Sequence, residues 1–168
     1  VGAVRARRIL RSVIADEVRR QYGVEVIGTE GDDVINDHSS PNPPLINLGS
    51  GDDFVRGNGG NDLIEGLAGS DTLYGGDGND TINGGTEADS IHGDAGNDIL
   101  SGNDGDDRVS GDAGADTLYG GQGEDDLYGG TEDDNLYGGS QNDLLLGGDG
   151  NDLLDGGNDD DVLLGLSG

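Results

Sequence analysis

A repeat of nine residues governs most of this sequence. From Leu48 to Leu164, 117 residues divide into thirteen consecutive units of nine without an insertion or a deletion. A fourteenth unit, residues 28–36, lies upstream. In all fourteen units the sixth position is aspartate and the eighth is aliphatic, as in Asp71 and Leu73. A fixed period of this kind predicts a solenoid, in which one small structural unit stacks on copies of itself.

Each unit has the pattern of a turn followed by a very short strand. Positions seven to nine, such as Thr72-Leu73-Tyr74, alternate so that the aliphatic side chain points one way and its neighbours the other, which is typical of a three-residue strand. Positions one to five hold Gly, Asn, Asp and other small residues, which favour tight or left-handed turns. Stacked units would align their eighth-position side chains as one thin core, with strands about 4.8 Å apart.

The stacked turns favour the binding of a hard cation. Each turn exposes main-chain carbonyl groups and one carboxylate, so two stacked turns could surround an ion with oxygen alone. The chain has no cysteine and only two histidines, His38 and His92, so sites rich in sulfur or imidazole are excluded. Oxygen ligands in a flexible cage suit calcium much better than zinc or copper.

The pattern Gly-Gly-x-Gly-x-Asp-x-aliphatic-x, as in residues 75–83, resembles the RTX, or haemolysin-type, calcium-binding repeat. This resemblance covers Gly28 to Gly168 and implies an all-β fold, a right-handed parallel β-roll in which two nonapeptides make one full turn. It also implies calcium ions between each unit and the unit two further along, on alternate edges of the roll, with turn carbonyls completing each shell. With one ion per such pair in the unbroken array, about eleven sites are expected. The metal ligands implied by the resemblance are the sixth-position aspartates Asp33, Asp53, Asp62, Asp71, Asp80, Asp89, Asp98, Asp107, Asp116, Asp125, Asp134, Asp143, Asp152 and Asp161.

Four units depart from the pattern at position four. Glycine occupies that position in ten units, but Glu87, Glu132, Gln141 and Asp159 occupy it in the others. A residue other than glycine in a left-handed turn costs about 1 kcal/mol. These units are therefore expected to form weakened half-sites, unless Glu87 and Glu132 supply an extra oxygen.

Charge narrows the choice of partners. The formal net charge is −28, from 36 acidic residues against eight arginines, and six of those arginines precede Gly23. Such an acidic surface argues against nucleic acid and against anionic membranes as partners. In the absence of calcium, a disordered chain is expected, because the core is thin and the charges repel one another. The absence of cysteine fits a secreted bacterial protein without disulfides, and the resemblance implies type I secretion to the extracellular space.

Three regions are expected along the chain. Residues 1–23 have the pattern of an amphipathic α-helix that caps the roll or ends a preceding domain, with a basic membrane-surface helix as the alternative. Residues 24–47 hold a first strand, the first repeat and a proline-containing loop that is either a degenerate unit or a bulge. Residues 48–168 form the roll, and their end, four residues into another unit, suggests a fragment boundary.

Tyrosines are expected to line the outside of the roll. Tyr119 and Tyr137 are eighteen residues apart, so they should stack on one face while Tyr128 lies on the other. Such residues, with the apolar side chains of the last repeats, either support strand pairing or form a docking surface.

No catalytic motif accompanies the repeat. The sequence lacks His-Glu-x-x-His and Gly-x-Ser-x-Gly, and it has no lysine for a phosphate-binding loop. The leading hypothesis is therefore a non-enzymatic calcium-binding module that folds outside the cell as part of a larger secreted protein. Two alternatives are an accessory domain of a secreted hydrolase or epimerase and a structural spacer of a surface adhesin. The domains covalently continuous with this chain would distinguish them.

Overall fold

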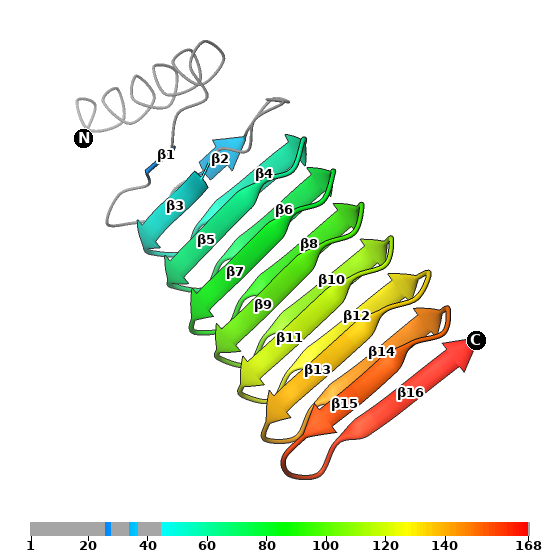
Figure 1. Cartoon of the computed structure of the whole chain (residues 1–168). Helices are drawn as coiled ribbons and strands as arrows, with labels where there is room; N and C mark the ends of the chain where they lie inside the picture. Colours follow the sequence, from blue (N-terminus) through cyan, green and yellow to red (C-terminus); the bar gives the residue numbers. More distant parts are fainter. Residues whose placement is uncertain (1–25, 28–33, 37–44, 168) are drawn as a thin grey trace, which may run out of the picture.

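The structure is a computed structural model that describes residues 26–27, 34–36 and 45–167. Its sixteen strands form two sheets (Figure 1). The odd-numbered strands are β1 Val26–Ile27, β3 Leu45–Ser50, β5 Leu63–Ala68, β7 Thr81–Thr86, β9 Ile99–Asp104, β11 Thr117–Gln122, β13 Asn135–Ser140 and β15 Leu153–Gly157. The even-numbered strands are β2 Val34–Asn36, β4 Phe54–Gly59, β6 Thr72–Asp77, β8 Ser90–Ala95, β10 Arg108–Ala113, β12 Asp126–Thr131, β14 Leu144–Asp149 and β16 Val162–Ser167.

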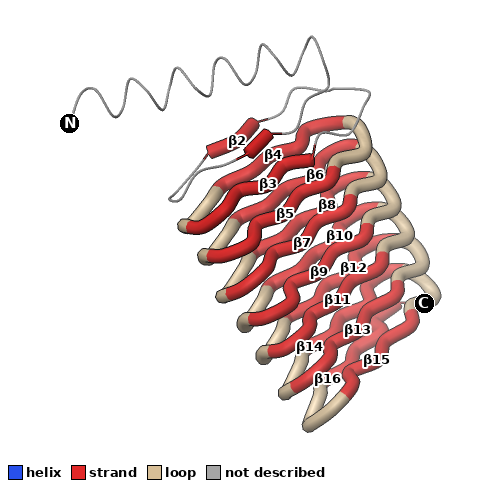
Figure 2. Tube along the Cα trace, turned by 60° about the vertical axis from the view of Figure 1, so that its left-hand side comes forward, coloured by secondary structure: helices blue, strands red, loops and turns tan. Residues whose placement is uncertain are grey.

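Successive strands alternate between the two sheets. All odd-numbered strands form one eight-stranded sheet, all even-numbered strands form the other, and every pairing is parallel. Leu118 pairs with Leu136, and Leu127 with Leu145, so neighbours in a sheet are eighteen residues apart. Two nonapeptides therefore make one turn of a parallel β-solenoid of about seven turns, which confirms the expected roll (Figure 2).

The described part of the chain contains strands and turns and no helix. The amphipathic helix expected within residues 1–23 lies outside the described residues, as does the proline-containing segment 37–44. No helix in the described ranges has the length and apolar character needed to cross a membrane.

The strands are longer than the sequence predicts. The prediction of three-residue strands is wrong, because most strands run for six residues, from position seven of one unit to position three of the next. Position two adopts a positive φ within the strand, for example 111° at Gly76 and 79° at Leu67. Extended pairing at positions one to three lets those backbone groups bond to the layers above and below, which buried groups require. Only positions four to six remain as the turn.

The core consists of the eighth-position side chains. From Val55 to Leu145 they are at most 1% exposed, and Leu48 joins them from position one. Each fully buried side chain of this kind contributes about 1.5–3 kcal/mol. Leu163 in β16 is 42% exposed, because β16 ends its sheet and no further layer covers it.

The first layers carry two additional residues per turn. Val26 pairs with Ile46 and Val34 pairs with Phe54, offsets of twenty residues instead of eighteen. The two extra residues therefore lie between β2 and β3. Strand β3 then begins at Leu45.

Aromatic side chains stack along the outer faces. The rings of Tyr119 and Tyr137 lie 5.1 Å apart on the odd-numbered sheet, while Tyr128 lies in β12 of the other sheet, beneath the guanidinium group of Arg108. The predicted separation of these tyrosines is thus confirmed. On the even-numbered sheet, Tyr74 stacks on His92 with ring centroids 4.9 Å apart.

Candidate metal site

The sixth-position aspartates lie at the end of the turns, where each immediately precedes a strand. Asp33 lies outside the described residues, and Asp152 and Asp161 in the last layers are partly exposed. The others are at most 3% exposed: Asp53, Asp62, Asp71, Asp80, Asp89, Asp98, Asp107, Asp116, Asp125, Asp134 and Asp143. Burial of this many carboxylates in a small fold is unusual and requires a compensating interaction.

One oxygen of each carboxylate belongs to a hydrogen-bonded ladder. The backbone N–H of Asp89 donates to Oδ1 of Asp107 (2.8 Å), and the N–H of Asp107 donates to Oδ1 of Asp125 (2.8 Å). The same bond joins aspartates eighteen residues apart from Asp53 to Asp161. The aspartates are therefore brought together along each edge in steps of one layer, as the repeat predicts.

The other oxygen is the distinctive feature of the site. In the part of the chain that the structure describes, buried Oδ2 atoms that accept no hydrogen bond belong to Asp71, Asp80, Asp89, Asp98, Asp107, Asp116, Asp125, Asp134, Asp143 and Asp152. Buried polar atoms in folded proteins almost always have a partner. A regular series of unpartnered carboxylate oxygens indicates that a cation completes the site.

Burial raises the pKa of a carboxyl group, because the ionised form loses its hydration. This holds for Asp71, Asp80, Asp89, Asp98, Asp107, Asp116, Asp125, Asp134 and Asp143. The donated N–H bond lowers each pKa, but by less than burial raises it. The pKa rises to about 7 for Asp89, Asp98 and Asp125. It rises to about 6 for Asp71, Asp107, Asp116 and Asp134. Without a cation, the fold at neutral pH must bury charged groups that repel one another.

We therefore expect acid to stabilise the calcium-free roll. A carboxyl group whose pKa is raised on folding stabilises the fold below its unfolded pKa of 3.8, and that contribution is lost as the pH rises towards 6 or 7. In calcium-free buffer, far-ultraviolet circular dichroism should show more β structure at pH 4 than at pH 7.5. With saturating calcium, β structure should persist at pH 7.5. A calcium-free β signal that grows with pH would contradict this assignment.

The donor set suits a hard cation. Among the described residues, no three His, Cys, Asp or Glu side chains gather at one point. A bound ion would therefore need main-chain oxygens as well as carboxylates, and oxygen-only ligands of this kind suit calcium. The residues present fit calcium on these grounds.

Glycine at position one gives the carboxylate its space. A Cβ atom added at Gly111 would overlap Oδ2 of Asp116 and would lie 2.7 Å from the carbonyl oxygen of Gly129 in the next layer. Any larger residue there would displace the aspartate. The glycine pattern and the aspartate pattern thus have one common cause.

Position five carries a second ladder, which sequence reasoning missed. Oδ1 of Asn79 accepts the N–H of Asn97 (3.1 Å), and Oδ1 of Asn97 accepts the N–H of Ala115 (3.2 Å). This ladder runs opposite to the aspartate ladder, because the side chain accepts from the following layer and not from the preceding one. The available signal was the frequency of Asn and Asp at position five.

The four exceptional residues at position four adopt the expected backbone. Glu87, Glu132, Gln141 and Asp159 have φ values between 71° and 80°. The carboxylate of Glu87 accepts the N–H of Gly69 (3.0 Å) and the hydroxyl of Thr86 (2.6 Å). Its oxygen therefore bonds to the preceding layer in this structure.

Comparison with known families agrees with this geometry. The family model described as RTX calcium-binding nonapeptide repeat matches the chain four times, over residues 47–82, 74–109, 101–136 and 128–163. Together the matches span residues 47–163. No curated protein matches the chain.

Proposed function

The chain belongs to the RTX calcium-binding nonapeptide repeat family, and from this premise we propose that calcium drives its folding outside the cell, as a module of a larger secreted protein. The observation that carries the proposal is the series of buried Oδ2 atoms without a partner. Calcium would neutralise adjacent carboxylates and occupy those oxygens. The family is a calcium-binding family and not a catalytic one, so we assign no reaction to the module.

The proposed ligands are the fourteen sixth-position aspartates named above, with turn carbonyls completing each shell. Each ion would lie between aspartates eighteen residues apart, such as Asp107 and Asp125. The thirteen unbroken units contain eleven such pairs, so about eleven ions, carrying roughly +22, would offset most of the formal charge of −28. Residues 48–168 would be the calcium-dependent part of the chain.

Folding and binding are coupled in this proposal. The core contains essentially one aliphatic side chain per nonapeptide, and repulsion among the carboxylates opposes its formation. Calcium that binds only the folded chain shifts the equilibrium towards the roll. The low calcium concentration of the cytoplasm and the higher concentration outside would then restrict folding to the extracellular space, which fits the secretion typical of the family.

Circular dichroism with two cations tests the proposal. At neutral pH, calcium should convert a largely unstructured chain into a β-rich one, with a cooperative midpoint near 10⁻⁴–10⁻³ M, the range of extracellular modules. Magnesium at the same concentration serves as the control and should not do so, because it requires compact octahedral geometry and releases water reluctantly. A β-rich spectrum in excess chelator at pH 7.5 would refute the proposal.

A further inference from the structure

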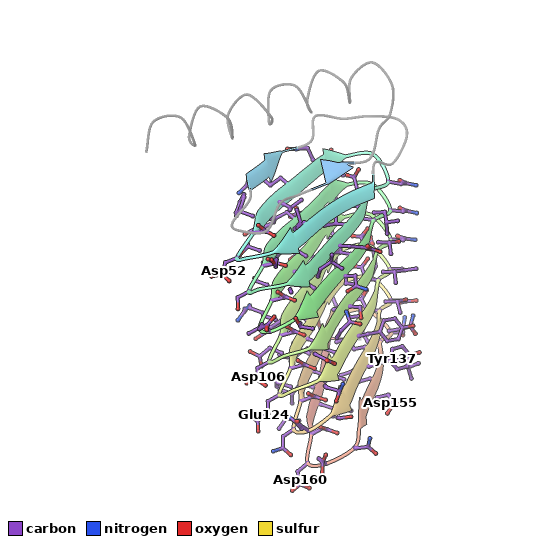
Figure 3. All side chains as sticks on the ribbon, turned by 90° about the vertical axis from the view of Figure 1, so that its left-hand side faces the viewer. Asp52, Asp106, Glu124, Tyr137, Asp155 and Asp160 are labelled. Atoms are coloured by element: carbon purple, nitrogen blue, oxygen red, sulfur yellow. The ribbon has the colours of Figure 1, made fainter. Side chains whose placement is uncertain are left out.

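The two edges of the roll have different turns. Edge A comprises the turns that lead from odd-numbered to even-numbered strands, with position-four residues Gly51, Gly69, Glu87, Gly105, Gly123, Gln141 and Asp159. Edge B comprises the turns from even-numbered to odd-numbered strands, with Gly60, Gly78, Gly96, Gly114, Glu132 and Gly150. Figure 3 labels four position-five residues along edge A, namely Asp52, Asp106, Glu124 and Asp160.

Edge B is regular over residues 60–116. The N–H groups of its glycines at position four donate to a carbonyl of the next layer, for example Gly78 to Ala95 (2.7 Å) and Gly96 to Ala113 (2.8 Å). The position-five ladder is continuous from Asn61 through Asn79 and Asn97 to Ala115. Each turn in this stretch is thus held by main-chain and side-chain bonds to its neighbours.

Edge A is interrupted over residues 69–88, and Gly105 again donates its N–H to the carbonyl of Gln122 (2.8 Å). The N–H of Gly69 donates to the carboxylate of Glu87 instead of to a carbonyl of the next layer. Among the described residues, the side chains of Ser70 and Ala88 give no position-five bond to the following turn, and Ala88 has no polar atom with which to make one. A second interruption follows, where the N–H of Gln141 donates to Asp159.

Backbone strain at position four adds to this asymmetry, whereas at position two residues other than glycine with a positive φ precede turns of both edges, such as Leu67 and Asp94. Three of the four position-four residues that are not glycine lie on edge A, Glu87, Gln141 and Asp159, and all three have a positive φ. Side chains other than glycine rarely adopt that conformation without cost. On edge B, Glu132 is the exception to glycine at position four, and Ala115 is the exception to a polar residue at position five. Glu132 lies beyond the regular stretch of residues 60–116, and Ala115 lies at its end.

We infer that the two edges form two classes of calcium site, and that edge B binds calcium more tightly and fills first. The inference rests on the proposed function and adds the order of loading to it. Main-chain oxygens supply part of each shell, and folding and binding are coupled, so the hydrogen bonds that a turn makes to neighbouring turns in the roll add to the free energy of binding its ion. A turn that lacks its bonds and is strained must be ordered by the ion itself. The carboxylate of Glu87 is exposed, so salt screens its charge, and it does not reverse the difference in calcium affinity between the two edges.

A calcium titration of the whole chain, followed separately at residues of edge A and of edge B, tests the inference. Amide NMR signals of Gly78, Gly96 and Gly114 should reach their calcium-bound positions at a lower calcium concentration than those of Gly69 and Glu87. One or two missing hydrogen bonds correspond to about a tenfold separation of the midpoints. Calorimetry should resolve the same two classes. Simultaneous loading of both edges would overturn the inference while leaving calcium binding intact, whereas no response to calcium would refute the proposed function itself.

Single substitutions should move the two classes separately. Ala88→Asn supplies the missing position-five acceptor and should lower the edge A midpoint severalfold; Ala113→Asn, at an exposed position of β10, is its control. Asn97→Ala removes one position-five hydrogen bond of edge B and should raise the calcium midpoint of edge B severalfold. Asn97→Asp should restore this midpoint, because aspartate accepts the same bond at Asp106 and Asp133. Equal effects of Ala88→Asn and Ala113→Asn on edge A would contradict the role of the ladder.

Discussion

Alanine in place of Gly96 is expected to destabilise the calcium-loaded roll by more than about 2 kcal/mol. Gly96 has a φ of 139°, where an L side chain is strained, and its Cβ would overlap the carbonyl oxygen of Gly78 in the preceding layer. The obstructing atom is backbone, so relief would require the two layers to separate. Urea denaturation at saturating calcium measures the loss as a lower midpoint.

Gly59→Ala provides the control on the same edge. A Cβ there would meet nothing closer than Asp77 at 3.7 Å, and no positive φ is required. The equivalent position already holds alanine in other units, at Ala68, Ala95 and Ala113. This variant should differ from the parent by no more than about 0.5 kcal/mol. Equal destabilisation by the two substitutions would mean that glycine at position four matters for reasons other than the stacking of layers.

The overall architecture could be predicted from the period. Aspartate and aliphatic residues at fixed positions of thirteen uninterrupted units require identical environments, which only stacked copies provide. The observed pairing of Leu118 with Leu136 and the burial of both follow from this. The number of units in each turn came from the resemblance to the repeat family, because nine residues alone do not determine how many units close a turn.

Strand length could not be predicted from the same pattern. Glycine and asparagine at positions one to three favour turns when each unit is considered alone. Stacking reverses this preference, because each layer offers hydrogen-bonding partners to the backbone of the next. Leu67 illustrates the effect, since it adopts a φ of 79° that its side chain disfavours. Tertiary context therefore overrides local propensity at position two.

The site was predicted at the level of residues but not of atoms. The sequence identifies Asp107 and its equivalents as candidate ligands. Only the structure shows that Oδ1 belongs to a backbone hydrogen bond while Oδ2 has no partner. That distinction depends on which neighbouring layer donates its N–H to the carboxylate, and the sequence pattern does not specify this. The position-five ladder escaped prediction for the same reason, since its bonds join residues eighteen apart.

Loss of one carboxylate should have an effect that depends on its place in the array. Asp107 lies in the seventh of the thirteen units, is 2% exposed, and is bonded to Asp89 on one side and Asp125 on the other. By the proposed pairing it would contribute to two calcium ions. Asp161, on the same edge, accepts a bond from Asp143 alone and would contribute to one ion. A central defect also uncouples the two halves of a solenoid, whereas terminal layers fray with little consequence.

We therefore expect Asp107→Ala to raise the calcium midpoint by roughly fivefold or more and to lower cooperativity, because two shells lose an oxygen and the N–H of Asp89 loses its acceptor. Asp161→Ala should shift the midpoint by less than about twofold. Calcium titrations followed by far-ultraviolet circular dichroism measure both. Asp155→Ala, at the exposed Asp155 labelled in Figure 3, controls for the loss of one charge and should leave the midpoint nearly unchanged. Equal shifts for Asp107→Ala and Asp161→Ala would mean that the sites act independently, which stacked turns sharing their aspartates do not allow.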